Sequence, residues 1–142
     1  MKKIITAVAL LLATCTLSYA QCDKKVVLTA SKTEYLGTDS TVQKSVDENT
    51  EVVFDKTSLV VTTGQNGDHV MTARINSTTC DWKIPYKEGK TVLKTTFADG
   101  SEAKNVTITI TGKDGKLIFT AQVEGEDRII KLAPDKFEEK KS

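Results

Sequence analysis

The sequence predicts an all-β protein: an antiparallel up-and-down meander of about eight to ten strands, closed into a barrel. Three observations predict this fold. Short segments of alternating apolar and polar residues follow one another, and outside the charged tail none carries the pattern of an amphipathic helix. Turn dipeptides separate them, namely Asp99-Gly100, Asp114-Gly115 and Glu124-Gly125, where glycine adopts φ > 0 without steric cost. The connections are short, which favours a closed barrel over a sandwich with long crossing loops.

The N-terminal segment predicts export. Two lysines precede an apolar stretch, Ile4–Ala13, and small residues at Ser18 and Ala20 suit cleavage by a signal peptidase. The apolar stretch is shorter than the about 20 residues that a transmembrane helix needs. We therefore expect residues 1–20 to be a signal peptide and residues 21–142 to form a single domain in a periplasmic or secreted protein.

The three cysteines bear on processing and cross-linking. Cys15 is a possible site for a lipid anchor, but Thr14 before it is larger than the residue usual in lipoprotein signals, so free export is favoured. Cleavage after Ala20 leaves Cys22 and Cys80. In an oxidising compartment these two can form a disulfide worth about 2–4 kcal/mol, and the alternative is two unpaired thiols.

Each predicted strand of the mature chain has one apolar face, and in the strand at 79–86 we expect Cys80, Trp82 and Ile84 to share the face that points into the barrel. Val26, Leu28 and Ala30 alternate with their neighbours in the first strand, which the segment around Tyr35 either extends or follows as a second strand. The charged tail is expected to be solvated, with Phe137 covering the barrel rim. The other strands are predicted at 41–46, 50–55, 58–63, 69–75, 79–86, 91–98, 103–111, 117–123 and 128–132, with further turns at 37–40, 47–49, 64–68 and 87–90.

Several short motifs from Asn76 to the tail resemble a known family. They are Cys80-Asp81-Trp82-Lys83, Tyr86-Lys87-Glu88-Gly89-Lys90, the strand Val106–Ile110, Gly112-Lys113-Asp114-Gly115-Lys116 and Asp135-Lys136-Phe137. They are similar to motifs of the small lipocalin-like proteins that Bacteroidetes-type bacteria export. The resemblance implies an eight-stranded calycin barrel.

The polar residues argue against several classes of function. The chain carries 20 basic and 19 acidic residues, and no basic run alternates with aromatic residues, so we expect no nucleic-acid binding. The one histidine, His69, follows a turn signal, and no Gly-x-Ser-x-Gly elbow accompanies it. No Cys-x-x-Cys or His-x-x-x-His pair offers the ligands of a zinc site. We expect no enzyme activity, no metal and no cofactor.

The apolar interior remains as the candidate for function. The lumen of an eight-stranded barrel is either filled by side chains or holds one small ligand, and a cavity of about 300 Å³ or more would favour the ligand. We predict an exported, non-catalytic barrel that binds a small apolar molecule. The alternative is a periplasmic or cell-surface interaction protein with a filled barrel, whose loops at 37–40, 47–50 and 64–68 bind or inhibit a protein partner. The candidate ligand contacts, for which plain core packing is the competing role, are Trp82, Tyr86, Phe97, Met71 and Phe119.

Overall fold

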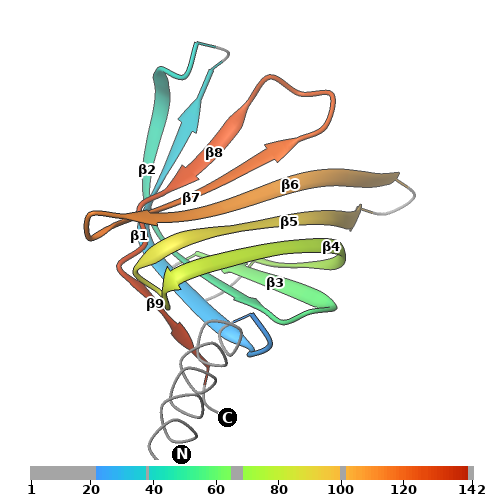
Figure 1. Cartoon of the computed structure of the whole chain (residues 1–142). Coiled ribbons are helices and arrows are strands. Elements are labelled where there is room, and N and C mark those ends of the chain that lie inside the picture. The colour runs from blue at the N-terminus through green and yellow to red at the C-terminus, as the bar shows by residue number, and fades with distance from the viewer. Residues whose placement is uncertain (1–21, 38, 65–68, 100–101, 141–142) are drawn as a thin grey trace, which may run out of the picture.

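The computed structural model describes residues 22–140 except 38, 65–68 and 100–101 (Figure 1). The predicted signal peptide, with Cys15, lies outside these residues. In the described part no helix is long and apolar enough to span a membrane. The strands that it contains are β1 (Val26–Leu36), β2 (Val42–Phe54), β3 (Ser58–Thr63), β4 (His69–Ile84), β5 (Glu88–Asp99), β6 (Glu102–Lys113), β7 (Lys116–Val123), β8 (Ile129–Leu132) and β9 (Lys136–Glu139).

Antiparallel pairing of neighbours closes the sheet. Each strand from β1 to β7 pairs with the next, and β8 pairs back with β1. The predicted all-β meander barrel is confirmed, with eight strands in the closed sheet and β9 as one extra strand. β2 occupies one edge of β1 along the whole length of β1. On the other edge of β1, β9 pairs with the first half of the strand and β8 with the second half. Pro134, which has no N–H to donate, lies between them.

Strand β4 is one long strand where the sequence pattern predicts two, at 69–75 and 79–86. A β-bulge at Asn76 interrupts its pairing with β5, between the register positions of Ile75 and Ser77. The bulge adds one residue on one side, so the inward-facing positions change from odd to even numbers. A change of phase inside one bulged strand gives the same sequence pattern as a break between two strands. This is why the sequence predicts two strands where the structure has one.

Two further predictions about strands are wrong for a related reason. The predicted turn at 47–49 lies inside β2, which joins the segments 41–46 and 50–55 and continues its pairing with β1 through an irregularity. Ile84 was expected on the inner face with Trp82, but its exposed fraction is 47%. A second bulge between these two residues turns Ile84 outward.

The end of the barrel formed by the β4–β5 and β6–β7 hairpins is closed by aromatic side chains. Trp82 is 2% exposed, which confirms that its ring faces the interior. Phe137 lies on β9, its ring centroid 5.6 Å from that of Trp82 and 5.0 Å from that of Tyr86. The charged tail was expected to be solvated, with Phe137 covering the barrel rim. Instead, part of the tail forms β9, which pairs with the start of β1 and carries the ring of Phe137 into the core. The same core cluster contains Val26, Leu28, Phe54, Leu59, Leu93 and Ile110.

Two glycines make room for the indole ring. Gly89 is the register partner of Trp82 on β5, and Gly112 is the partner of Gly89 on β6. A Cβ atom at Gly89 would lie 2.7 Å from Cδ2 of the ring, and one at Gly112 would lie 2.9 Å from Cζ3. A larger residue at either position would therefore displace the ring or the backbone around it.

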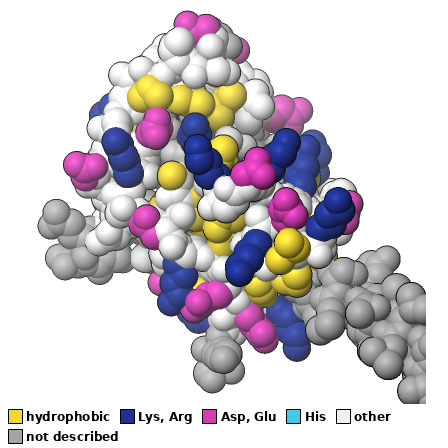
Figure 2. Space-filling model, turned by 60° about the vertical axis from the view of Figure 1, so that its left-hand side comes forward, with side chains coloured by type: hydrophobic (Ala, Val, Ile, Leu, Met, Phe, Trp, Pro, Cys, Tyr) yellow, Lys and Arg dark blue, Asp and Glu magenta, His cyan; other side chains and the backbone are white. Residues whose placement is uncertain are grey.

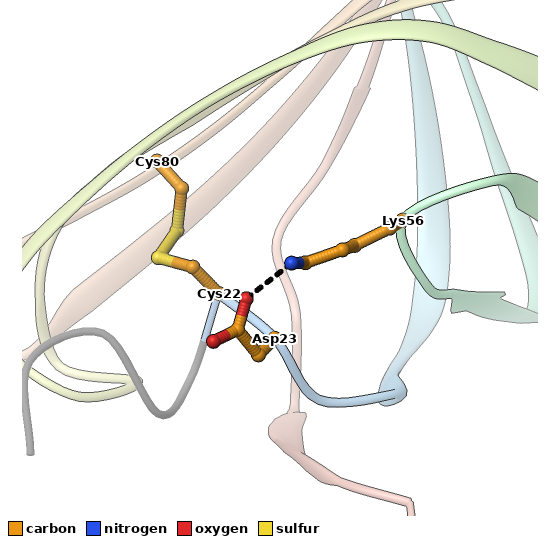
Figure 3. Close-up of polar contacts among 4 residues, drawn as sticks. All are labelled: Cys22, Asp23, Lys56 and Cys80. Atoms are coloured by element: carbon orange, nitrogen blue, oxygen red, sulfur yellow. Dashed lines mark ion pairs between the residues drawn. A yellow bond between two sulfur atoms is a disulfide. The ribbon is translucent and has the colours of Figure 1, made fainter.

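The segment before β1 is cross-linked to the barrel wall (Figure 3). The structure joins Cys22 to Cys80 on β4 by a disulfide, with a Cα–Cα distance of 6.0 Å, so the bridged alternative is the one observed. Beside it, Asp23 forms an ion pair with Lys56, which lies in the turn between β2 and β3. The disulfide is the stronger restraint, because both side chains of the ion pair are more than half exposed and such pairs contribute little.

Charges of both signs are interspersed on the face that Figure 2 shows, with hydrophobic side chains between them. No large area of this face carries a single sign of charge. A mixed surface of this kind gives no strong field for steering a highly charged partner.

Candidate functional site

The barrel contains a cavity of about 700 Å³ at the end opposite the aromatic core. Side chains from all strands between β1 and β8 line it, so the cavity is the lumen of the barrel and not a groove between two strands. Its volume lies within the range of about 300–1,000 Å³ that is usual for ligand pockets. Its hydrophobic lining includes Val52, Phe97, Ile108, Phe119, Ala121 and Leu132.

The five predicted ligand contacts divide between the two ends. Met71, Phe97 and Phe119 line the cavity. Phe119 is a buried part of its wall, whereas Met71 is 49% exposed at the start of β4, where the cavity opens. Trp82 and Tyr86 do not line the cavity but belong to the aromatic core. The structure therefore does not bring the five residues together, and a ligand in the lumen would not lie beside Trp82.

The packing of Trp82 and Tyr86 explains why they are separate from the cavity. The indole N–H of Trp82 donates to Thr91 Oγ1 at 2.7 Å, so its polar group is satisfied within the core. Tyr86 lies in the turn between β4 and β5 with φ 62°, and its ring packs edge-on against Phe137. Burial of the Tyr86 hydroxyl, together with the nearby carboxylate of Glu139, raises the pKa of that hydroxyl. Both rings close the barrel and leave the lumen to other residues.

Two threonines in the cavity wall were missed by sequence reasoning. Thr33 on β1 is 3% exposed and Thr50 on β2 is 5% exposed, and both line the cavity. Neither hydroxyl oxygen has a hydrogen-bond partner in the part of the chain that the structure describes. The alternation of Thr50 with the inward-facing Val52 was a usable signal, but a search for large apolar residues passed over it.

The mouth of the cavity is polar. Glu48 and Lys104 contribute to its lining, and Lys104 Nζ lies 3.6 Å from Glu126 Oε1 in an exposed ion pair. The guanidinium carbon of Arg128 lies 6.0 Å from the ring centroid of Tyr35, another lining residue. The lumen thus has an apolar interior behind a rim that carries both signs of charge.

A second depression, of about 600 Å³, lies on the outer surface over β4 to β7. A row of hydrogen bonds crosses it: Asn76 Nδ2 donates to Thr96 Oγ1 at 2.8 Å, and Thr96 Oγ1 donates to Asn105 Oδ1 at 2.9 Å. Asn105 Nδ2 then donates to Glu124 Oε2 at 2.9 Å. Because these side chains bond one another, the row links neighbouring strands on the solvent side and is a weaker candidate site than the lumen.

Neither metal-site geometry nor comparison with known proteins adds another candidate site. Within the described ranges, no group of three or more His, Cys, Asp or Glu side chains is arranged to hold a metal ion. Comparison of the chain with protein-family models, with curated proteins and with solved structures found no match. The candidate site is therefore defined by the geometry of the lumen.

Proposed function

We propose that this protein is an exported, non-catalytic barrel that binds a small, mostly apolar molecule in its lumen. The observation that carries the proposal is the cavity of about 700 Å³ with hydrophobic side chains around it. An apolar occupant is favoured there because it removes both its own apolar surface and that of the lining from water. Most of the lining residues are apolar, so water in this space makes fewer hydrogen bonds than it does in bulk.

The filled-barrel alternative has less support. An interaction protein of that kind would have a packed interior, whereas the cavity is larger than the about 300 Å³ that we take as the lower limit for a ligand site. Residues 47–50, which the alternative uses as a binding loop, belong to strand β2. The ligand-binding function is therefore the better supported of the two.

Export and membership of the lipocalin-like proteins are parts of the same proposal. The order of charged, apolar and small residues in 1–20 supports a signal peptide. The disulfide between Cys22 and Cys80 supports an oxidising compartment such as the periplasm or the medium, where such bonds persist. The motifs between Asn76 and Phe137 support the lipocalin-like relationship.

Native mass spectrometry of the protein purified from its own host tests this function. A bound molecule adds its mass to that of the folded chain and is released when the protein is denatured. We expect a discrete added mass, and an organic extract of the same sample should contain the released molecule. A folded protein with no added mass that also fails to bind N-phenylnaphthylamine, a neutral apolar fluorescent probe, would contradict the proposal.

A further inference from the structure

We propose that the occupant of the lumen carries a neutral polar group, a hydroxyl or a carbonyl, that is held by Thr33 and Thr50. This inference rests on the proposed function and names the class of ligand: a mostly apolar alcohol, aldehyde, ketone or ester. It excludes a plain hydrocarbon, which has no group to bond the two hydroxyls, and a carboxylate, which would bring a charge into the same wall.

The first argument is a contrast among the buried threonines. Thr95 Oγ1 donates to a backbone carbonyl at 2.7 Å, and Thr91 Oγ1 accepts the indole N–H of Trp82. These two hydroxyls lie outside the cavity lining and are satisfied. Thr33 and Thr50 line the cavity, and among the described residues their hydroxyls have no partner. Buried hydroxyls are normally hydrogen-bonded, so the two exceptions at the lumen need an explanation.

The second argument is their shared position in the wall. Thr50 is the register partner of Ala30, and Thr33 is the partner of Val46, so the two threonines flank the irregular stretch in the β1–β2 pairing. Irregularities of this kind re-aim side chains and are frequent beside binding sites. Since each side chain lines the cavity, rotation about χ1 exchanges its methyl for the hydroxyl and presents the oxygen to an occupant.

The third argument is charge. A carboxylate at the depth of Thr33 and Thr50 would need a cation, since an unpaired buried charge is far more costly than a buried neutral group. The basic side chain that contributes to the lining is Lys104 on β6, which three strands separate from β2 in either direction around the barrel. Its ammonium group is partly exposed and already lies 3.6 Å from a carboxylate oxygen of Glu126. The β1–β2 wall therefore suits a neutral polar group.

Displacement of N-phenylnaphthylamine by n-octanol, n-octane and octanoate tests the inference. The three competitors share an apolar chain length and differ in the polar group. Each is titrated against the wild-type protein and a Thr33→Val, Thr50→Val double variant, whose side chains keep nearly the same shape. The change in affinity between the two proteins is compared for each competitor, so that the different hydration of the competitors cancels.

We expect the double variant to bind n-octanol roughly tenfold more weakly than wild type does, because the loss of a hydrogen bond to a neutral group lowers binding affinity by about a factor of ten. The affinity for n-octane should be unchanged or higher. A Thr33→Ser, Thr50→Ser variant retains both hydroxyls and should retain the preference for n-octanol. The matched control is Thr95→Val, which removes a buried hydroxyl outside the cavity and should change the affinities for n-octanol and n-octane by the same factor.

The remaining outcomes separate this inference from the proposed function. Equal changes for n-octanol and n-octane in the double variant would overturn the role of Thr33 and Thr50 and leave an apolar binding site intact. A selective loss for octanoate instead of n-octanol would overturn the assignment of a neutral group. If the probe and all three competitors fail to bind the folded wild-type protein, the proposed function fails with the inference.

Discussion

The indole Nε1 of Trp82 donates a hydrogen bond to Thr91 Oγ1 at 2.7 Å in the closed end of the barrel. The indole is satisfied and packed, whereas the hydroxyls of Thr33 and Thr50 in the cavity wall are not bonded within the described residues. The closed end of the barrel is thus packed with aromatic side chains, and the cavity lies at the other end.

Truncation of the indole should destabilise the fold strongly. Trp82→Ala removes a ring that is 2% exposed and leaves a cavity in the aromatic core, so we expect a loss of about 3–5 kcal/mol in the free energy of unfolding. Denaturant unfolding measures this loss. The neighbouring exposed residue gives a control, since Lys83→Ala should stay within about 0.5 kcal/mol of wild type. A loss below about 1 kcal/mol for Trp82→Ala would show that the ring is not in the core.

A methyl group at Gly112 should be destabilising because it has no space. The added Cβ would lie 2.5 Å from the carbonyl oxygen of Lys87, as well as close to the indole of Trp82. We expect Gly112→Ala to cost about 1–3 kcal/mol, as overpacking of a well-packed core does. Thermal and denaturant unfolding would show the effect, with Lys113→Ala as the exposed neighbour. Stability equal to that of wild type would contradict the close packing of β6 on the indole.

Removal of the disulfide should loosen the N-terminal segment. The double variant Cys22→Ala, Cys80→Ala should lose about 2–4 kcal/mol of unfolding free energy, because the bond restrains the unfolded chain. A reducing agent should lower the stability of the wild-type protein to that of the variant and leave the variant unchanged. If the reductant has no effect on a wild-type sample whose thiols are shown to be free, the bond does not stabilise the fold.

The turn between β2 and β3 should give part of the stability its dependence on pH. The Asp55 carboxylate accepts the backbone N–H groups of Ser58 and Thr57, and these bonds hold the pKa of Asp55 below its usual value. A depressed folded-state pKa stabilises the fold at pH values above the unfolded pKa of about 3.9, and the contribution disappears as the pH falls through the folded-state value.

We therefore expect Asp55→Ala to be about 1 kcal/mol less stable than wild type near neutral pH, a figure reduced by partial solvent exposure, and the difference to shrink in acid. Urea unfolding from neutral pH down to about pH 3 measures it. Asp55→Asn is the control: its amide oxygen accepts the same bonds but does not titrate, so its stability relative to Asp55→Ala should not vary with pH. A difference between Asp55→Ala and wild type that is constant with pH would contradict this role for the carboxylate.

The strand pattern of the sequence predicts the fold well because alternation and turn residues are local signals. Alternating residues and glycine turns located β3, β6, β7 and β8 nearly to their ends. The bulge at Asn76 could not be distinguished from a break in the chain, because both change the phase of the apolar residues. β9 was missed because its sequence, Lys136–Glu139, has one apolar residue, and the strand exists only through pairing with β1.

The candidate site was less predictable, because it depends on which layer of the lumen each strand position reaches. Trp82 and Phe119 both lie on the inward phase of their strands and both belong to the core cluster. No local pattern tells that Phe119 also lines the cavity and that Trp82 does not. That distinction depends on how β4 and β7 are staggered along the axis of the closed barrel. The alternation of residues within a single strand does not show this stagger. Thr33 and Thr50 were passed over because inward-facing threonine is common in strands, and the absence of hydrogen-bond partners is visible only in three dimensions.

The central claim is that the lumen binds an apolar molecule, and filling the lumen tests it most directly. Ala121 on β7 lines the cavity, whereas the adjacent Thr120 borders a depression on the outer surface. The test compares the binding of N-phenylnaphthylamine by the wild-type protein, Ala121→Phe and Thr120→Phe. Circular dichroism first establishes that all three proteins are folded. The wild-type protein and Thr120→Phe should bind the probe saturably at one site, and Ala121→Phe should bind it at least about tenfold more weakly, a loss of about 1.4 kcal/mol. Binding by Ala121→Phe equal to that of wild type, or no binding by any of the three, would contradict the claim.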